Sequence, residues 1–173
     1  MSTSASRSNG TVVDASKEAA LLNAVGPAFS KLRRGSALIK GEDPVPRKDM
    51  SRTLVLNIVE EGPEASGQEV TVGVVAERLG VDPSVASRMV SDCISSGYLR
   101  RSASQLDGRR TILELTEDGE KMLERFRRHQ RTAFEFITHD WSREDRLDFA
   151  RLLIKYADTL TALRLDSQAD SRI

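Results

Sequence analysis

One stretch of the chain, residues 82–116, most constrains its fold because it predicts a helix followed directly by a β-hairpin. Asp82 suits the cap of that helix, and Pro83 suits its first position, where the missing N–H costs no hydrogen bond. Small residues then recur in steps of four, three and four, which places them on one helical face: Ala86, Val90, Cys93 and Gly97. That face suits close packing against another helix, and the final glycine can adopt the left-handed conformation that closes a helix.

The rest of this stretch is polar and rich in arginine. We expect strands over residues 98–101 and 111–115, joined by residues 105–110, which contain the turn-forming pair Asp107-Gly108. The outward face of the preceding helix carries five polar residues: Ser84, Ser87, Arg88, Ser91 and Asp92. Such a surface offers little for catalysis and much that could lie against a nucleic-acid backbone.

The segment before residue 82 predicts a partner helix. Thr71 can cap a helix that places Val75 and Leu79 one turn apart. Residues 80–82 then supply a tight, glycine-containing turn of the kind that links two helices at a steep angle. Helix, turn, helix and hairpin together make a winged helix, whose second helix enters the major groove of DNA.

The pattern of residues 71–119 resembles the multiple antibiotic resistance regulator (MarR) family of bacterial transcription factors. The matching segments are Ser84-Val85-Ala86-Ser87-Arg88, Gly97-Tyr98-Leu99, Asp107-Gly108-Arg109-Arg110 and Leu115-Thr116-Glu117-Asp118-Gly119. Asp107 and Arg109 have the spacing of the family's wing. The resemblance implies that Asp107 holds Arg109 and that Arg109 reaches the minor groove. Over residues 17–165 the resemblance rests only on the order and length of the helices.

The expected fold is mainly α with a small β wing (α+β): a winged helix-turn-helix flanked by N- and C-terminal dimerisation helices. We expect a disordered N-terminal tail over residues 1–14, a helical dimerisation region over 15–48 and 117–165, a DNA-binding lobe over 49–116, and a C-terminal tail over 166–173.

Several finer expectations accompany this division. Pro27 should kink or loosen the first helix, and a second helix over residues 49–61 should bury Leu54 and Ile58. Residues 67–70 are expected to add a short strand to the hairpin. A further helix, capped by a threonine at 116, should run to about residue 139.

The last helix, which Ser142 can cap with Asp145 at its third position, has two apolar stripes. They are Phe149, Leu153, Tyr156, Leu160 and Leu163, and beside them Leu147, Ala150, Ile154 and Ala157. This width exceeds the ~100° expected of a helix that rests on its own domain. We therefore predict an isologous homodimer and an operator of two inverted half-sites; a monomer that uses both stripes in its own core is the alternative.

Three residues of the recognition helix besides Arg88 are candidate DNA contacts. Ser84 and Ser87 suit phosphates or bases, and Val85 suits a thymine methyl group. Arg88 suits a guanine edge, or else it pairs with Asp92 four residues later. An aspartate on this face would repel phosphate.

Other cations extend this surface. In the wing, Arg110 is expected to meet a phosphate. Arg47, Lys48 and Arg52 either add backbone contacts or are simply solvated. Cys93, on the inner helix face, is read as a buried, inert thiol, with a redox sensor as the alternative.

The amino-acid composition excludes several other classes of protein. Lys+Arg and Asp+Glu are equal at 26 each, which counts against a non-specific, architectural DNA binder. One cysteine excludes an internal disulfide, and no run of ~20 apolar residues or signal-peptide pattern is present, so we expect a cytoplasmic protein with no membrane association. His129 and His139 share no helical face, and neither metal, cofactor nor catalytic residues are predicted.

We therefore interpret the chain as a dimeric regulator that binds double-stranded DNA, with repression as the favoured role and activation as the alternative. The resemblance implies release by a small, often aromatic ligand, for which Phe29, Arg33 and Trp141 are candidate contacts. The alternative is a winged-helix module that binds protein and not DNA.

Overall fold

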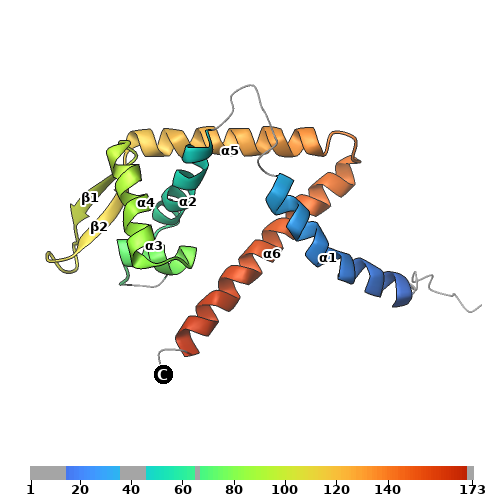
Figure 1. Cartoon of the computed structure of the whole chain (residues 1–173), viewed down its shortest axis with the longest axis horizontal. Helices are drawn as coiled ribbons and strands as arrows, with labels where there is room; N and C mark the ends of the chain where they lie inside the picture. The colour runs from blue at the N-terminus through green and yellow to red at the C-terminus, as the bar shows by residue number, and fades with distance from the viewer. Residues whose placement is uncertain (1–14, 36–45, 65–66, 171–173) are drawn as a thin grey trace, which may run out of the picture. The chain divides into compact units, whose positions relative to one another are not determined.

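The structure is a computed structural model that describes residues 15–35, 46–64 and 67–170. The expected tail over residues 1–14 lies outside them. The chain divides into two units, Met1–Lys40 and Gly41–Ile173. The first unit contains one described helix, α1 (Ala15–Gly35), which continues across Pro27 (Figure 1).

The second unit begins with a winged helix-turn-helix. Its elements are α2 (Arg47–Glu61), α3 (Val72–Leu79), α4 (Pro83–Ser95), β1 (Leu99–Ala103) and β2 (Thr111–Leu115). Two helices then follow, α5 (Glu117–Ile137) and α6 (Arg143–Asp170). α5 ends two residues before the expected position, and α6 continues past residue 165.

The two strands form an antiparallel hairpin in which Leu99 pairs with Leu115 and Ala103 pairs with Thr111. The expected third strand is wrong: residues 67–70 approach β2 through one main-chain hydrogen bond, from Leu113 N–H to the Val70 carbonyl at 2.9 Å. A single bond does not build a ladder, so residues 67–70 do not form a third strand.

The core of the lobe lies between α2, α3, α4, the hairpin and the start of α5. Among its fully buried side chains are Val55, Leu56, Val75, Val90, Cys93 and Leu123. Ile58 is buried as predicted, whereas the prediction for Leu54 is wrong, because 52% of this residue is exposed. Leu54 faces a surface hollow of about 400 Å³ that Leu79 and Leu160 also line.

The turns and caps explain where the helices begin and end. The Thr71 hydroxyl accepts the Val74 N–H, and the Thr116 hydroxyl accepts the Gly119 N–H, as expected for N-caps. Asp82 precedes α4 but makes no side-chain cap, because the Val85 N–H donates instead to the Asp82 carbonyl at 2.9 Å.

Two glycines in the segments that resemble the MarR family occupy positions where a side chain would not fit the backbone. Gly97 ends α4 with a φ of 80°, a conformation that L side chains rarely adopt. A Cβ on Gly119 would overlap the carbonyl oxygen of Tyr98, so glycine allows α5 to begin directly beside β1. The start of α5 is thereby fixed against the winged helix.

α6 has a capped start and an apolar surface. Ser142 Oγ accepts the Asp145 N–H at 3.0 Å and donates to the Asp145 carboxylate at 2.6 Å. Both predicted stripes remain exposed over their large residues, with Leu153 at 46%, Ile154 at 62% and Leu160 at 52%. Among the described helices, none has the length and apolar character needed to span a membrane.

Candidate nucleic-acid interface

The outward face of α4 presents the polar residues singled out from the sequence. Ser84, Ser87 and Arg88 are exposed, and Val85 is half-buried. The Arg88 guanidinium turns back along its own helix, where Nε donates to the Ser84 carbonyl at 3.3 Å. α4 therefore offers two hydroxyls and one cation within about one helical turn.

The loop between β1 and β2 is held by a network that the sequence analysis missed. Ser104 is buried, and its hydroxyl donates to Glu69 while accepting the N–H groups of Leu106 (3.0 Å) and Asp107 (2.9 Å). Glu69 also accepts the Gln105 N–H at 3.2 Å. The only sequence signal was a serine after a predicted strand. One buried hydroxyl thus organises the loop that carries the wing arginines.

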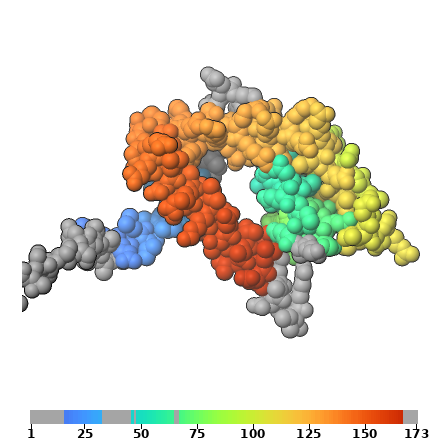
Figure 2. Space-filling view, turned by 180° about the vertical axis from the view of Figure 1, so that it is seen from behind, coloured from blue at the N-terminus to red at the C-terminus, as the bar shows by residue number. Residues whose placement is uncertain are grey.

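Asp107 contacts Arg109 through the main chain. Its Oδ1 accepts the Arg109 N–H at 3.1 Å, and its carbonyl accepts the Arg110 N–H at 2.8 Å. Asp107, Arg109 and Arg110 are all exposed. In Figure 2 the yellow hairpin stands out from the surface of the lobe. The aspartate therefore shapes the turn and leaves both guanidinium groups in solvent.

Arg100, in contrast, is paired within the hairpin. Its Nε lies 2.8 Å from Glu114 Oε2, and the same oxygen accepts the Ser102 hydroxyl at 2.7 Å. These contacts, with the Ser102 hydrogen bond as the larger cause, hold the pKa of Glu114 below its usual value. Arg100 adds less positive potential to the wing than its sequence position indicates.

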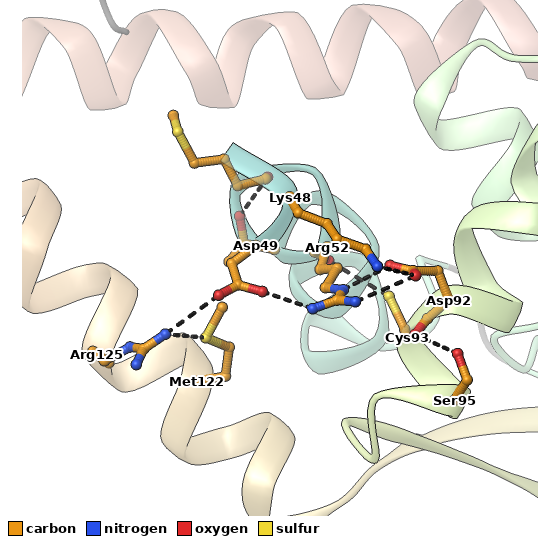
Figure 3. Close-up of polar contacts among 10 residues, drawn as sticks. Lys48, Asp49, Arg52, Asp92, Cys93, Ser95, Met122 and Arg125 are labelled. Atoms are coloured by element: carbon orange, nitrogen blue, oxygen red, sulfur yellow. Dashed lines mark hydrogen bonds and ion pairs between the residues drawn. The ribbon is translucent and has the colours of Figure 1, made fainter. Parts of the chain in front are cut away.

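Asp92 is not an unpaired anion on the DNA side of α4. It accepts two hydrogen bonds from Arg52 of α2, from Nε at 2.6 Å and from Nη2 at 3.2 Å, and Lys48 Nζ lies 3.1 Å from its Oδ1 (Figure 3). The Arg52 hydrogen bonds are the main reason that the pKa of Asp92 is lowered. The alternative for Arg88, an ion pair with Asp92, is wrong, because Asp92 pairs with Arg52 and Lys48 of α2. Arg88 Nε donates instead to the Ser84 carbonyl.

Arg52 is held within the protein by these contacts. From the sequence, it was expected to contact the DNA backbone or to be solvated. Only 12% of its side chain is exposed, and its Nη1 also lies 2.8 Å from Asp49 Oδ1. Asp49 in turn lies 3.5 Å from Arg125 of α5. The Asp49–Arg52 pair has the three-residue spacing of neighbours on a helix, a signal that could have been noticed.

The other two cations at the start of α2 differ. The Lys48 side chain is 68% exposed, while the side chain of Arg47 lies outside the described residues.

Cys93 is fully buried, and burial is the main cause that raises its pKa to about 11. Its thiol is therefore protonated at neutral pH, which agrees with the inert reading and not with a redox sensor.

The predicted effector contacts fall in different places. Phe29 belongs to the first unit, and the side chain of Arg33 lies outside the described residues. Trp141, between α5 and α6, packs edge-on against Phe149 with ring centroids 5.5 Å apart. Within the described part of the chain, no group of three or more His, Cys, Asp or Glu side chains could hold a metal ion.

The order of helices, the hairpin and the exposed face of α4 define a winged helix-turn-helix protein. Residues 49–110 match the model of the MarR family, so this part of the chain is similar to the winged helix of that family. Among curated proteins, none matches the sequence.

Solved structures of the same architecture cover nearly the whole chain. A MarR family protein from Bacillus stearothermophilus is 19% identical, with 87% of this chain and 99% of that chain covered and a TM-score of 0.56. The YusO protein from Bacillus subtilis is 18% identical, with 84% and 98% covered and a TM-score of 0.55. A crystal structure of MarR is 16% identical, with 91% and 98% covered and a TM-score of 0.54. At these identities the likeness establishes the fold alone.

Proposed function

We propose that this chain is a sequence-specific regulator of transcription that binds double-stranded DNA. The observation that carries the proposal is the exposed row of Ser84, Ser87 and Arg88 on α4, next to a wing whose loop leaves Arg109 and Arg110 in solvent. α4 has the length to enter the major groove and the side chains to contact base edges there, while the wing reaches the adjacent backbone or minor groove.

The charge distribution supports specific rather than indiscriminate binding. Net charge is zero, so long-range attraction to DNA is weak. Pairing of Asp92 with Arg52 removes the one carboxylate that would face phosphate from α4. Affinity for DNA should therefore depend mainly on contacts in the grooves. It should fall only moderately with added salt, because the protein's cations neutralise few phosphates.

The regulator would act as a homodimer. α6 exposes many large apolar side chains, more than an isolated soluble helix normally presents: Leu147, Phe149, Leu152, Leu153, Ile154, Tyr156, Leu160 and Leu163. A two-fold axis would place two copies of α4 in successive major grooves about 34–36 Å apart. The operator is then an inverted repeat, and a bound dimer represses by occluding the promoter.

Release by a small ligand is the finer part of the proposal. The hollow of about 400 Å³ between α2, α3 and α6 has the volume of a small-molecule site, with Leu54, Leu79 and Leu160 as apolar walls. Arg78 and Arg164, which also line it, are both paired with Glu64. A ligand there would release DNA only if it binds more tightly to an arrangement whose α4 helices no longer match groove spacing.

Binding-site selection from random duplexes with the purified chain tests the proposal. We expect an inverted repeat whose half-sites lie one helical turn apart, and weaker selection at one base position of each half-site in Arg88→Ala. Recovery of no enriched sequence would contradict a sequence-specific regulator.

A protein-binding winged helix is the second candidate, because the net charge of zero is low for a nucleic-acid-binding domain. A mobility shift on the selected duplex at two salt concentrations separates the two functions. A salt-sensitive shift supports the regulator, and the absence of any shift at low salt supports the protein-binding module.

A further inference from the structure

A fork of two hydrogen bonds joins α2 to the recognition helix α4. Arg52 Nε lies 2.6 Å from Asp92 Oδ2, and Nη2 lies 3.2 Å from Asp92 Oδ1 (Figure 3). This geometry uses both carboxylate oxygens and two guanidinium nitrogens, so it restricts orientation as well as distance.

The guanidinium is itself fixed before it reaches Asp92. Nη1 lies 2.8 Å from Asp49, which is buried and whose other oxygen faces Arg125 of α5. The guanidinium carbon also lies 5.7 Å from the centroid of the Tyr98 ring. The Arg52 side chain therefore has little conformational freedom. Through it, Asp92 of α4 is held in a fixed position relative to α2 and α5.

Asp92 occupies a place on α4 where such a restraint affects DNA contacts. It follows Arg88 by four residues, about one turn of the helix. The next residue, Cys93, is fully buried, so apolar packing holds one side of α4 while the fork holds a neighbouring side. Rotation of α4 about its axis would move Arg88 and break the fork together.

We propose that Arg52 is a positioning residue that sets the orientation of α4 through Asp92, and that this pair contributes to sequence discrimination without touching DNA. The proposal rests on the proposed DNA-binding function. Lys48 provides an internal comparison, because it also pairs with Asp92 from α2 but is 68% exposed and uses a single flexible ammonium.

Asp92→Asn distinguishes a purely electrostatic role of Asp92 from a positioning role, because the two predict opposite changes in DNA binding. If Asp92 mattered only as a negative charge near DNA, its removal would strengthen binding to every sequence. If the fork positions α4, the amide introduced by Asp92→Asn keeps one uncharged acceptor oxygen and turns an NH2 donor toward the guanidinium, so discrimination falls although the protein is more positive.

The experiment measures affinity of the full-length chain for the selected operator and for an unrelated duplex, with thermal unfolding of each variant as a check on folding. Asp92→Asn and Arg52→Lys should reduce the ratio of operator to unrelated affinity on the order of tenfold. Arg52→Lys keeps the charge and removes the fork, so it decides the question if Asp92→Asn fails to fold.

Two variants serve as controls. Lys48→Gln should weaken binding to both duplexes alike and reduce the salt slope by at most about 1, with the ratio unchanged. Asp148→Asn makes the same change of charge as Asp92→Asn in an exposed ion pair on α6 and should leave the ratio unchanged.

Each outcome has a definite meaning. An unchanged ratio in folded Asp92→Asn and Arg52→Lys, with a normal operator preference in the unsubstituted chain, would overturn the positioning role alone. An unsubstituted chain that does not prefer any duplex would overturn the proposed function, and the positioning role with it.

Discussion

The hydroxyl of Ser104 donates to the carboxylate of Glu69, a contact between residues 35 apart in the chain. The same oxygen accepts the N–H groups of Leu106 and Asp107, so one side chain joins the segment before α3 to the turn of the wing. This contact therefore helps to order the loop that carries Arg109 and Arg110.

Ser104→Ala should therefore loosen the wing and destabilise the lobe. Removal of the hydroxyl leaves two N–H groups and a carboxylate without their partner, a loss of about 1–3 kcal/mol. Hydrogen exchange should become faster at Leu106 and Asp107 in particular. Ser95→Ala, at an exposed serine of α4, is the matched control and should leave this exchange unchanged.

Arg88→Ala should lose about 1–3 kcal/mol of operator binding and relax specificity at one base position, as expected if this side chain reads a guanine edge. Arg128→Ala removes an exposed arginine from α5, with 65% of its side chain in solvent, and should bind normally. Titration of both variants with the selected duplex compares them. Equal affinity of the two variants would show that the outward face of α4 does not meet DNA.

The two wing residues Asp107 and Arg109 should respond differently to substitution. Arg109→Ala removes the proposed minor-groove contact, whereas Asp107→Ala leaves that charge and removes the acceptor for the Arg109 N–H. Asp107→Asn keeps an acceptor and should bind more tightly than Asp107→Ala. If Arg109→Ala bound as well as the unsubstituted chain at low and high salt, the wing would have no role in binding.

Cys93 should resist alkylation in the folded chain, and its raised pKa should make the free energy of unfolding fall as pH rises in the alkaline range. Burial raises its pKa to about 11 from an ordinary value near 9.0, so the unfolded chain loses this proton first. The associated stability is fully present below pH ~9 and is lost as pH rises through the pKa of about 11. Iodoacetamide labelling at pH 8 should be slow when folded and fast in urea. Rapid labelling of the folded chain would contradict a buried thiol.

Substitution of the apolar surface of α6 should change the oligomeric state. Leu153→Glu places a charge within the exposed stripe and should give a single chain of 19.1 kDa by sedimentation, where the unsubstituted chain gives a dimer. Lys155→Glu, on the opposite side of the helix, is the control and should remain dimeric. A monomeric unsubstituted chain at micromolar concentration would remove the dimer from the proposal.

Local patterns were sufficient for most of the architecture. The helical spacing of Ala86, Val90 and Cys93 predicted a buried face, and all three are fully buried. Thr71, Thr116 and Ser142 cap the helices that were expected to begin there. These signals succeed because caps and periodicity depend on residues only a few positions apart.

The partners of charged and polar side chains were decided only by the fold. Asp92 was read as an anion facing DNA and Arg52 as a surface cation, yet the two meet across 40 residues and neutralise each other. For the contact of Ser104 with Glu69, the sequence offered no more than a serine after a predicted strand. Such pairings depend on how helices and strands come together in space, which spacing along the chain does not contain. What the sequence by itself determined was the winged helix and its outward residues; the tertiary structure alone decided which charges remain available to a ligand.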